Sequence, residues 1–572
     1  MTTIKLRRGS AEEWTEVNPV LAQGEPGFDT TTGVLKVGDG TTAWADLPGY
    51  LADTELRATF AARTRTGVAA VGQGELVVNV KDYGATGNGT DDDTEKVQAA
   101  NSAAKGGVLY FPKGTYLVSA PIAAQSHTIY RGAGRTASTI KVAAGSGQSK
   151  VLDLSGCRDV IVEDLGLDGT GSGCIAGVYG SDNHSGKDWH VRRCLLTGFA
   201  PGSAPKNGQG AVYMWTANGV SVIDCVITAS GRGIRLDTPS GDVVVRGNRI
   251  TGGAGPVSAD GVMLTGISIN SSVQCDNARV SVTDNIVSGA DRDPYYPNGR
   301  EGHAIAVYKV ANVRITGNHC LASGRGILCS AGSFGAVVQG NTVERNWDAG
   351  IRCEPAIDDD ITVGGAGQRR GVVIVGNRCL GNSVVGASGS SANGTAITTS
   401  YAAGSTVVGN VVQDSGKHGI HCDSDRVVVV GNVVSNSWNG GASPLSGQGA
   451  KAGIGLYAAK DCIVAFNQCY DNQATRTQDY GLSVVTGDGG GPHVVFGNVL
   501  SGNGRGEIHD PQALVRNGFF GASPAARPAA LPATDAGTVD ESYGAEEAAV
   551  INNLRTRLEA LESRLRDIGL LG

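Results

Sequence analysis

The segment VVVVGNVVSNS, Val427 to Ser437, joins a run of four valines to a Gly-Asn pair and a second apolar stretch. β-Branched residues favour strands and Gly-Asn favours a tight turn, so the segment predicts strand, turn and strand. The spacing between its recurrences runs from 22 residues (Asn410 to Asn432) to 37 residues (Asn248 to Asn285). Such a period predicts a stacked-repeat architecture. The turn Asn recurs at Asn248, Asn285, Asn318, Asn341, Asn377, Asn410, Asn432, Asn467 and Asn498, and Cys225, Cys194 and Leu165 hold the same place upstream.

A second phrase precedes most of these turns, as in GIRLD at Gly233, GIRCE at Gly350 and GIHCD at Gly419. Each repeat therefore holds at least two short strands, and none contains a helix-length pattern. Helical solenoids are excluded, and a 22-residue unit is too short for the four strands of a propeller blade. The sequence predicts an all-β chain, a parallel β-helix of about twelve coils.

The repeat register gives an account of the twelve cysteines. Side chains alternate across a strand, so the Ile of each Gly-Ile phrase and the residue two later face inward. Cysteine shares that second place, and the place two after the turn Asn, with Val and Leu. No CxxC pair occurs. We therefore expect free thiols buried in columns of small apolar residues, and neither a metal site nor a cofactor.

The turn Asn residues form a column of their own. An Asn tolerates the left-handed conformation, and its amide can bond the backbone of the coils above and below. Because the flanking runs are too apolar for a surface hairpin, we expect an inward ladder of stacked Asn side chains. Ordinary surface turns are the alternative.

The segment before the repeat, residues 78–122, predicts a helix from Thr94 to Ala104 capped by Asp92 or Asp93, followed by two strands. A helix can cover the open first coil of a solenoid. DYGATGNGTDDDTEKVQAA (82–100) and YFPKGTYLV (110–118) resemble the start of the pectate-lyase-like domain of phage tailspikes and of polysaccharide lyases and hydrolases. The resemblance implies a right-handed β-helix and leaves the chemistry open, because that superfamily contains enzymes and plain binders.

The first 50 residues form a separate unit. Ser10 and Glu13 predict a capping box ahead of Trp14, and a glycine-rich hairpin follows. This pattern is similar to the small N-terminal module of phage tail-fibre and receptor-binding proteins, which implies attachment to the virion.

The C-terminal end has a different character. A Pro/Ala-rich linker leads to a helix whose apolar residues are spaced 3, 4, 3, 4, 3, which predicts a coiled coil. A lone amphipathic helix is the alternative, and the heptads do not decide between two strands and three; the tailspike resemblance implies a homotrimer. The predicted oligomerisation residues are Ile551, Leu554, Leu558, Leu561, Leu565 and Ile568. The predicted domains are 1–50 (virion attachment), 51–77 (connector), 78–512 (β-helix), 513–544 (linker) and 545–572 (coiled coil).

Net charge and hydropathy limit the classes of partner that are expected. The net charge is −7 with no basic run, so no nucleic acid is expected. No apolar stretch approaches 18 residues and the N-terminus lacks a secretory signal, so we expect no membrane insertion and synthesis in a host cytoplasm.

Two polar clusters are predicted on the outer face of the Gly-Ile strands, because coils stack about 4.8 Å apart and vertical neighbours touch. The first comprises Arg232, Arg235, Asp237, Asp260, Glu301, His303, Tyr308 and Arg325, and its candidate catalytic residues are Asp237, Glu301 and His303. The second comprises Asp348, Arg352, Glu354, His418, His421 and Asp423, and casual surface pairing is the alternative for both. Candidate substrate-binding residues are Arg232, Arg235, Asp260, Tyr295, Tyr296, Tyr308 and Arg325.

The sequence thus predicts a phage tailspike or tail-fibre protein, located in the virion tail, that binds bacterial surface polysaccharide. Whether it also cleaves the glycan, as a glycoside hydrolase or a polysaccharide lyase, stays open. Hydrolysis requires two carboxyls about 5–5.5 or 6.5–9.5 Å apart, and a lyase requires a base near an acidic C–H, for which His303 or an Arg is suited. A non-catalytic structural or receptor-binding tail protein is the alternative.

Overall fold

The computed structural model describes residues 7–50, 76–181, 187–199, 210–216, 218–229, 231–252, 265–290, 302–355, 371–382, 394–439, 450–485, 491–516 and 545–567. Internal contacts divide the chain into two compact units, Met1–Val78 and Asn79–Gly572. The predicted boundaries within these units remain predictions.

In residues 7–50, the N-terminal unit forms a small four-stranded sheet with one helix. Ser10 caps the helix and Glu13 bonds back to the Ser10 backbone, so the predicted capping box is confirmed. The rings of Trp14 and Trp44 stack with centroids 3.9 Å apart and form the core with Leu21 and Leu47. The sheet order is β1-β2-β3-β4. The elements are β1 (Arg7–Gly9), α1 (Ala11–Val17), β2 (Pro26–Asp29), β3 (Leu35–Val37) and β4 (Gly49–Tyr50).

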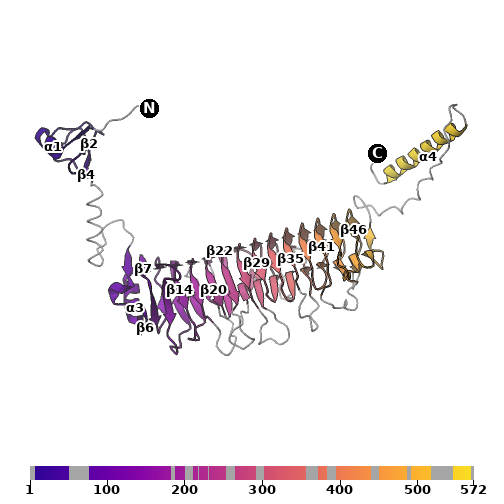
Figure 1. Cartoon of the computed structure of the whole chain (residues 1–572), viewed down its shortest axis with the longest axis horizontal. Coiled ribbons are helices and arrows are strands. Elements are labelled where there is room, and N and C mark those ends of the chain that lie inside the picture. The colour runs from indigo at the N-terminus through magenta and orange to yellow at the C-terminus, as the bar shows by residue number, and fades with distance from the viewer. Residues whose placement is uncertain are drawn as a thin grey trace. The chain divides into compact units, whose positions relative to one another are not determined.

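The second unit is a parallel β-helix, as predicted. Each coil contributes one strand to each of three parallel sheets, which we call sheets I, II and III in chain order. Figure 1 shows successive coils side by side from β7 to β46. Sheet I contains β5 (Val77–Asn79), β7 (Val108–Phe111), β10 (Ile129–Gly132), β13 (Arg158–Glu163), β16 (Lys187–Arg192), β19 (Asn218–Ile223), β22 (Ser240–Arg246), β25 (Arg279–Thr283), β28 (Arg314–Thr316), β31 (Val337–Gln339), β34 (Val373–Val375), β37 (Thr406–Val408), β40 (Val428–Val430), β43 (Ile463–Ala465), β46 (His493–Phe496) and β48 (Val515–Arg516).

Sheets II and III each contain 14 strands. Sheet II contains β6 (Asn88–Asp92), β8 (Gly114–Val118), β11 (Ser138–Val142), β14 (Gly166–Asp168), β17 (Leu195–Thr197), β20 (Val226–Ala229), β23 (Arg249–Gly252), β26 (Ile286–Ser288), β29 (His319–Leu321), β32 (Thr342–Glu344), β35 (Arg378–Leu380), β38 (Val411–Gln413), β41 (Val433–Ser435) and β44 (Gln468–Tyr470). Sheet III contains β9 (Ile122–Ala123), β12 (Lys150–Asp153), β15 (Ala176–Ser181), β18 (Val212–Trp215), β21 (Arg232–Asp237), β24 (Thr265–Cys275), β27 (His303–Val310), β30 (Arg325–Ser330), β33 (Ala349–Glu354), β36 (Ile397–Ser400), β39 (Ile420–Asp423), β42 (Ala452–Tyr457), β45 (Tyr480–Val485) and β47 (Gly506–His509).

The twelve predicted coils correspond to the strands β14 to β44 of sheet II and to a final bridge between Gln468 and Val499. Three further strands of this sheet, β6, β8 and β11, come before them. The turns into β8 and β11 contain no Gly-Asn pair, and the pair Gly87–Asn88 at the start of β6 follows no apolar run, so the repeat count started after these strands.

A helix begins the solenoid, as predicted. The 3-10 turn η1 (Val80–Tyr83) leads to helix α3 (Thr94–Ala103), whose Val97 and Ala100 are buried. The carboxylate of Asp92 accepts from the Thr94 N–H, whereas Asp93 accepts from the backbone of Thr86 and Gly87. Asp93 thus holds the N-cap position without a side-chain bond to the helix, and the carboxylate of Asp92 satisfies the first helical N–H instead.

The interior is lined by columns of apolar residues and thiols. All twelve cysteines are free and all but Cys275, which is partly exposed, are buried, which confirms the predicted core thiols. Cys379, for example, lies between Val343 and Val412 in register. Burial raises the pKa of the Cys379 thiol to about 12.

The predicted Asn ladder is confirmed. From Asn248 to Asn498, the side-chain amide of each Asn donates to the side-chain oxygen of the next at 2.9 or 3.0 Å. The same oxygen also accepts from the backbone N–H of the preceding Asn. From Asn248 to Asn498, backbone and side chain of each coil are thus tied to the next coil inside the core.

One detail of the turn differs from the expectation. The left-handed residue is the one before each ladder residue, such as Gly431 (φ 64°) or Asp284 (φ 56°), and not the Asn itself. Gly adopts this conformation without strain, and Asp tolerates it. The Asn is therefore required for its amide and not for its backbone.

The C-terminal helix α4 spans Ala545–Asp567. It contains five of the six predicted oligomerisation residues, and Ile568 lies outside the described residues. Among the described segments, no helix is both long enough and apolar enough to cross a membrane.

Candidate functional site

The outer face of sheet III carries the polar columns predicted from the Gly-Ile phrase. Strand pairing places Asp237 beside Asn270, and Tyr308 beside Ser330. In each strand the residues one and three after the buried Ile point outward, and the residue two before it joins them. We call these the first, second and third columns. The first column is Tyr179, Tyr213, Arg235, Ser268, Ala306, Leu328, Arg352, Thr398 and His421; the second is Trp215, Asp237, Asn270, Tyr308, Ser330, Glu354, Ser400 and Asp423; the third is Arg232, Thr265, His303, Arg325, Ala349, Thr395 and His418.

The residue before the Ile is glycine in most of these strands and alanine at Ala304 and Ala396. At Gly326 a Cβ atom would lie 2.6 Å from the Gly350 carbonyl oxygen of the next coil, so only glycine fits that close approach. His418, which lies just before β39, comes close to His421 of that strand, and their rings stack with centroids 5.4 Å apart.

The N-terminal part of the face is built around an ion pair. Arg235 donates from Nε to both Asp237 oxygens, at 3.0 and 2.8 Å, and both side chains are buried. The Tyr213 hydroxyl donates to Asp237 at 3.3 Å, and the Arg235 guanidinium lies 5.3 Å from the Tyr213 ring centroid. Burial raises the pKa of Tyr213. Both carboxylate oxygens of Asp237 are thus engaged by hydrogen bonds, and Trp215 beside it is 47% exposed.

His303 lies in the centre of the face. Burial, and the charges of Arg325 and then Arg352, hold its pKa well below the usual range, so its imidazole is neutral. Its Nε2 lies 3.3 Å from the Tyr308 hydroxyl, and its Nδ1 is buried without a hydrogen-bond partner. A neutral ring with one open nitrogen can accept or donate a single hydrogen bond to a ligand.

The two predicted clusters are joined by cross-coil ion pairs. Arg325, assigned to the first cluster, donates from Nε to Asp348 of the second. Arg352 pairs with Glu354 within its own strand. The clusters therefore form one continuous face, and the predicted division between them is not seen.

The C-terminal part of the face is built around Asp423. Burial raises the pKa of this carboxyl, and the Ser400 hydroxyl donates to its Oδ2 at 2.9 Å. Its Oδ1 is shielded from solvent without a partner, as are Nδ1 of His421 and Oγ1 of Thr398. Burial also lowers the pKa of His421.

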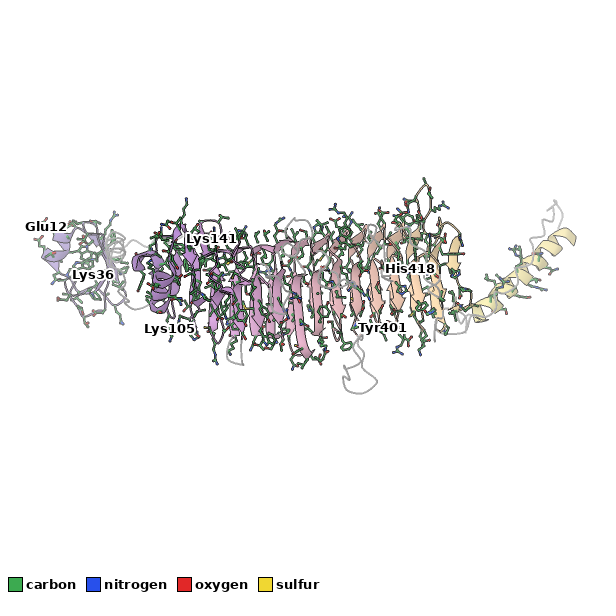
Figure 2. All side chains as sticks on the ribbon, turned by 90° about the horizontal axis from the view of Figure 1, so that it is seen from below. Glu12, Lys36, Lys105, Lys141, Tyr401 and His418 are labelled. Atoms are coloured by element: carbon green, nitrogen blue, oxygen red, sulfur yellow. The ribbon has the colours of Figure 1, made fainter. Side chains whose placement is uncertain are left out.

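His418 is held tightly beside this group. Its Nδ1 donates to the Ala452 carbonyl at 2.8 Å and its ring meets Trp438 edge-on, with centroids 4.9 Å apart. Burial, the neighbouring His421 and then Lys417 lower its pKa to about 3. Figure 2 labels His418 on the C-terminal half of the solenoid. Within the described part of the chain, no group of three or more His, Cys, Asp or Glu side chains is arranged to hold a metal ion.

Four of the predicted site residues, Asp260, Tyr295, Tyr296 and Glu301, lie outside the described residues. Asp237, Arg235, His303, Tyr308 and Arg325 lie on the outer face of sheet III, and Arg232 begins β21 on the same face. Sequence reasoning missed Tyr179, Tyr213 and Trp215, because β15 and β18 lack the Gly-Ile phrase. Thr398 was not among the predicted site residues either.

Three regions of the chain match known families. Residues 4–42 match the major tropism determinant N-terminal domain. Residues 77–274 match the family described as rhamnogalacturonase A/epimerase, pectate lyase-like, and residues 276–437 match the right handed beta helix region. These matches confirm the predicted resemblance to phage tailspike-like proteins with a right-handed parallel β-helix.

Individual relatives match smaller parts. The preneck appendage protein of Bacillus phage PZA is 30% identical over 122 residues, which are 20% of this chain and 14% of that protein. Alginate lyase 7 of Azotobacter vinelandii is 30% identical over 159 residues, 25% of this chain and 16% of that protein. The chain thus spans less than a fifth of each of these curated relatives. The solved Dettilon tailspike protein aligns with 15% identity and a TM-score of 0.43, over 77% of this chain and 70% of that one.

Proposed function

We propose that this chain is a phage tail protein whose sheet III binds a bacterial surface polysaccharide along its outer face. The observation that carries the proposal is the set of shielded polar atoms without partners on that face, at Arg235, His303, Thr398, His421 and Asp423. Buried polar groups in proteins nearly always have hydrogen-bond partners, so unfilled groups on one outer face favour a ligand rich in hydroxyls. The exposed ring of Trp215 offers a flat apolar surface for a sugar ring.

The N-terminal unit supports a place in the virion tail. It matches the major tropism determinant N-terminal domain, and a relative of the β-helix is a phage preneck appendage protein. In this proposal the N-terminal unit docks on other tail proteins, and the β-helix presents its ligand-binding face to the host.

A parallel homotrimer completes the proposal. In the single chain, the heptad residues Leu554, Leu558 and Leu561 of α4 are 57%, 66% and 45% exposed. An amphipathic helix that leaves its apolar stripe in water gains stability when copies pack stripe to stripe. The mass of the full-length protein in solution, compared with a chain ending before Gly544, tests this. An unchanged number of copies in the shorter chain would remove the helix from the proposal.

Binding is tested with a panel of purified bacterial capsules, lipopolysaccharide O-chains and cell-wall glycans. Trp215→Ala should weaken binding of the recognised glycan by about tenfold or more, which is about 1.4 kcal/mol of lost binding free energy. Tyr470→Ala removes an aromatic ring from sheet II and is the matched control. Equal losses in both variants, or no binding by the parent protein, would contradict the proposed face.

Cleavage of the glycan is a second candidate function, favoured by the carboxyl pair Glu354 and Asp423. They occupy the second column two strands apart, so their Cα atoms are separated by about 9.6 Å. Inverting glycoside hydrolysis uses carboxyls about 6.5–9.5 Å apart, one protonated and one ionised. Asp423, with its raised pKa, suits the acid, and Glu354, paired with Arg352, suits the ionised partner.

The test must also cover the catalytic residues predicted from the sequence, which are Asp237, Glu301 and His303. Incubation with the bound glycan should release new reducing ends from the parent protein, and Asp423→Asn should remove this activity while binding persists. Asp237→Asn is the comparison, because that carboxylate is already engaged by Arg235 and Tyr213. Unsaturated products would indicate a lyase, and absence of any product would leave the protein a binder.

A further inference from the structure

The outer face of sheet I changes character along the solenoid. In the N-terminal half it carries charged ladders, as where Glu163 pairs with both Arg131 and Arg192. Further along, the column of Arg192, Ile223 and Arg246 continues through three uncharged polar residues, Thr283, Thr316 and Gln339, and becomes apolar from Val375 onward. We call the apolar part the valine face. It consists of Val373, Val375, Thr406, Val408, Val428, Val430, Ile463, Ala465, Val494 and Phe496 on β34, β37, β40, β43 and β46.

The valine face points away from the core. In β40 the central Val429 is fully buried, and Val428 and Val430 on either side are partly exposed. The same alternation holds in β34, where Val373 is exposed and Ile374 is buried. The ten positions on five adjacent strands thus contain no charged side chain, Thr406 is the only polar one, and all but the buried Ala465 are at least partly exposed. Solvated sheet faces alternate apolar-in and polar-out, so this face is built for a partner.

Phe466 at the edge of the face gives an independent indication. It is 62% exposed and adopts the left-handed conformation (φ 55°) at the turn position where other coils have Gly431 or Asp284. That conformation is strained for a bulky residue. Its ring packs edge-on against Phe496, with centroids 5.1 Å apart, and a Cβ on Gly497 would come within 2.6 Å of it. Backbone strain of this kind is found preferentially at functional sites, and an exposed aromatic ring offers a large apolar contact surface.

We propose that the valine face is the surface along which copies of this chain pack side by side. The proposal rests on the parallel assembly proposed above. When copies are joined in parallel by α4, each coil of one copy lies at the same level as the same coil of the other copies. A charged ladder would then meet charges of its own kind, whereas an uncharged apolar face meets apolar surface. Valine-face contacts are intramolecular once the helices have joined, so a modest area is enough to hold them.

Cross-linking of the full-length protein tests the face. Val430→Cys and Thr316→Cys place a thiol at the same column position, one inside the valine face and one in the polar part of sheet I. The native cysteines of the β-helix are buried except for Cys275, and the parent protein measures their background. With a short bismaleimide, Val430→Cys should give at least about tenfold more product joining two copies than Thr316→Cys, a ratio that corresponds to about 1.4 kcal/mol.

The outcomes separate the face from the assembly. If the full-length protein has the mass of one chain, the parallel assembly and the face both fail. If it has the mass of several chains and Val430→Cys gives no more linked product than Thr316→Cys, only the face is overturned. A Val430→Cys thiol that is protected from maleimide but never links two copies would assign the face to the C-terminal segment of its own chain, which contains no cysteine.

A second variant removes the exposed ring of Phe466 without straining the fold. Phe466→Gly relieves the left-handed turn, so the coil is retained, while the exposed ring is lost. In the Val430→Cys background it should reduce the linked product severalfold with the β-sheet circular dichroism unchanged. An unchanged yield would overturn the place of Phe466 in the face.

Discussion

The Asn ladder and the outer face of sheet III are both stacks of polar side chains along one solenoid. They differ in how completely their polar atoms are hydrogen-bonded. Inside, each ladder amide between coils bonds its neighbours above and below, as Asn410 does with Asn377 and Asn432. Outside, Thr398 and His421 present shielded atoms without partners. A structural polar column is therefore one that closes on itself, and a column left open is where a ligand is expected.

Removal of a ladder residue should break the closed column with the largest effect. Asn410→Ala deletes bonds from the Asn377 N–H and amide and bonds to the Ile374 carbonyl and to Asn432. It leaves buried backbone groups unpaired, so we expect a loss of about 3 kcal/mol in the free energy of unfolding. Chemical denaturation measures it.

The matched control for this change is Gln413→Ala, an exposed residue on β38. A loss for Asn410→Ala no larger than that of the control would mean that the ladder contributes no stability beyond its backbone bonds.

The inner cysteine column sharpens the comparison, because a polar group placed there would meet only apolar side chains. Cys379 lies between Val343 and Val412. Cys379→Ser places a hydroxyl against both and should cost about 2 kcal/mol of unfolding free energy. Cys379→Val, a change of similar volume, should cost less than about 1.5 kcal/mol. Equal costs in denaturation would contradict an apolar column.

The fold was predictable because its signals recur. Strand alternation and the Gly-Asn turn repeat coil after coil, so a weak local pattern becomes decisive in sum. The coils around β8 and β11 turn without an Asn, and therefore the repeat alone could not count them. The helix α3 was predictable from its own capping and apolar spacing.

The site was predictable only in part. Register placed Asp237 and Asp423 in one column, because pairing in a β-helix follows the repeat. It could not reveal that Arg325 reaches Asp348 of the next coil, since Asp348 lies in the turn before β33 and outside the phrase. Nor could it reveal which side chains of the face are buried, because burial depends on how the whole chain folds around them.

The free energy of unfolding at acid pH extends the comparison to a titratable residue of the outer face, His418. The folded state lowers the pKa of His418 to about 3, whereas an unfolded His titrates near 6.5. Between these values the unfolded chain binds a proton that the folded chain does not, so stability falls as pH falls, by up to about 1.4 kcal/mol per pH unit. His418→Asn keeps a donor for the Ala452 carbonyl without the titrating ring, so its unfolding free energy should decline less steeply from pH 6.5 toward 3. An unchanged slope would place the acid sensitivity elsewhere.

The smallest expected change in stability is also the most discriminating. Thr398→Val replaces a hydroxyl that has no partner, at a residue that is 3% exposed, by a methyl group of nearly equal size. Inside the ladder the loss of a polar group costs stability; here the free energy of unfolding should stay the same or rise by up to about 1 kcal/mol, because an unpaired hydroxyl is no longer buried.

The glycan affinity of Thr398→Val should fall by about tenfold, since a hydrogen bond to the ligand would be lost from a desolvated position. Thermal unfolding and glycan binding of one variant thus give opposite signs if the column is open for a ligand. A loss of stability with unchanged binding would mean that Thr398 has a structural partner, and the outer column would then be a second ladder and not a binding face.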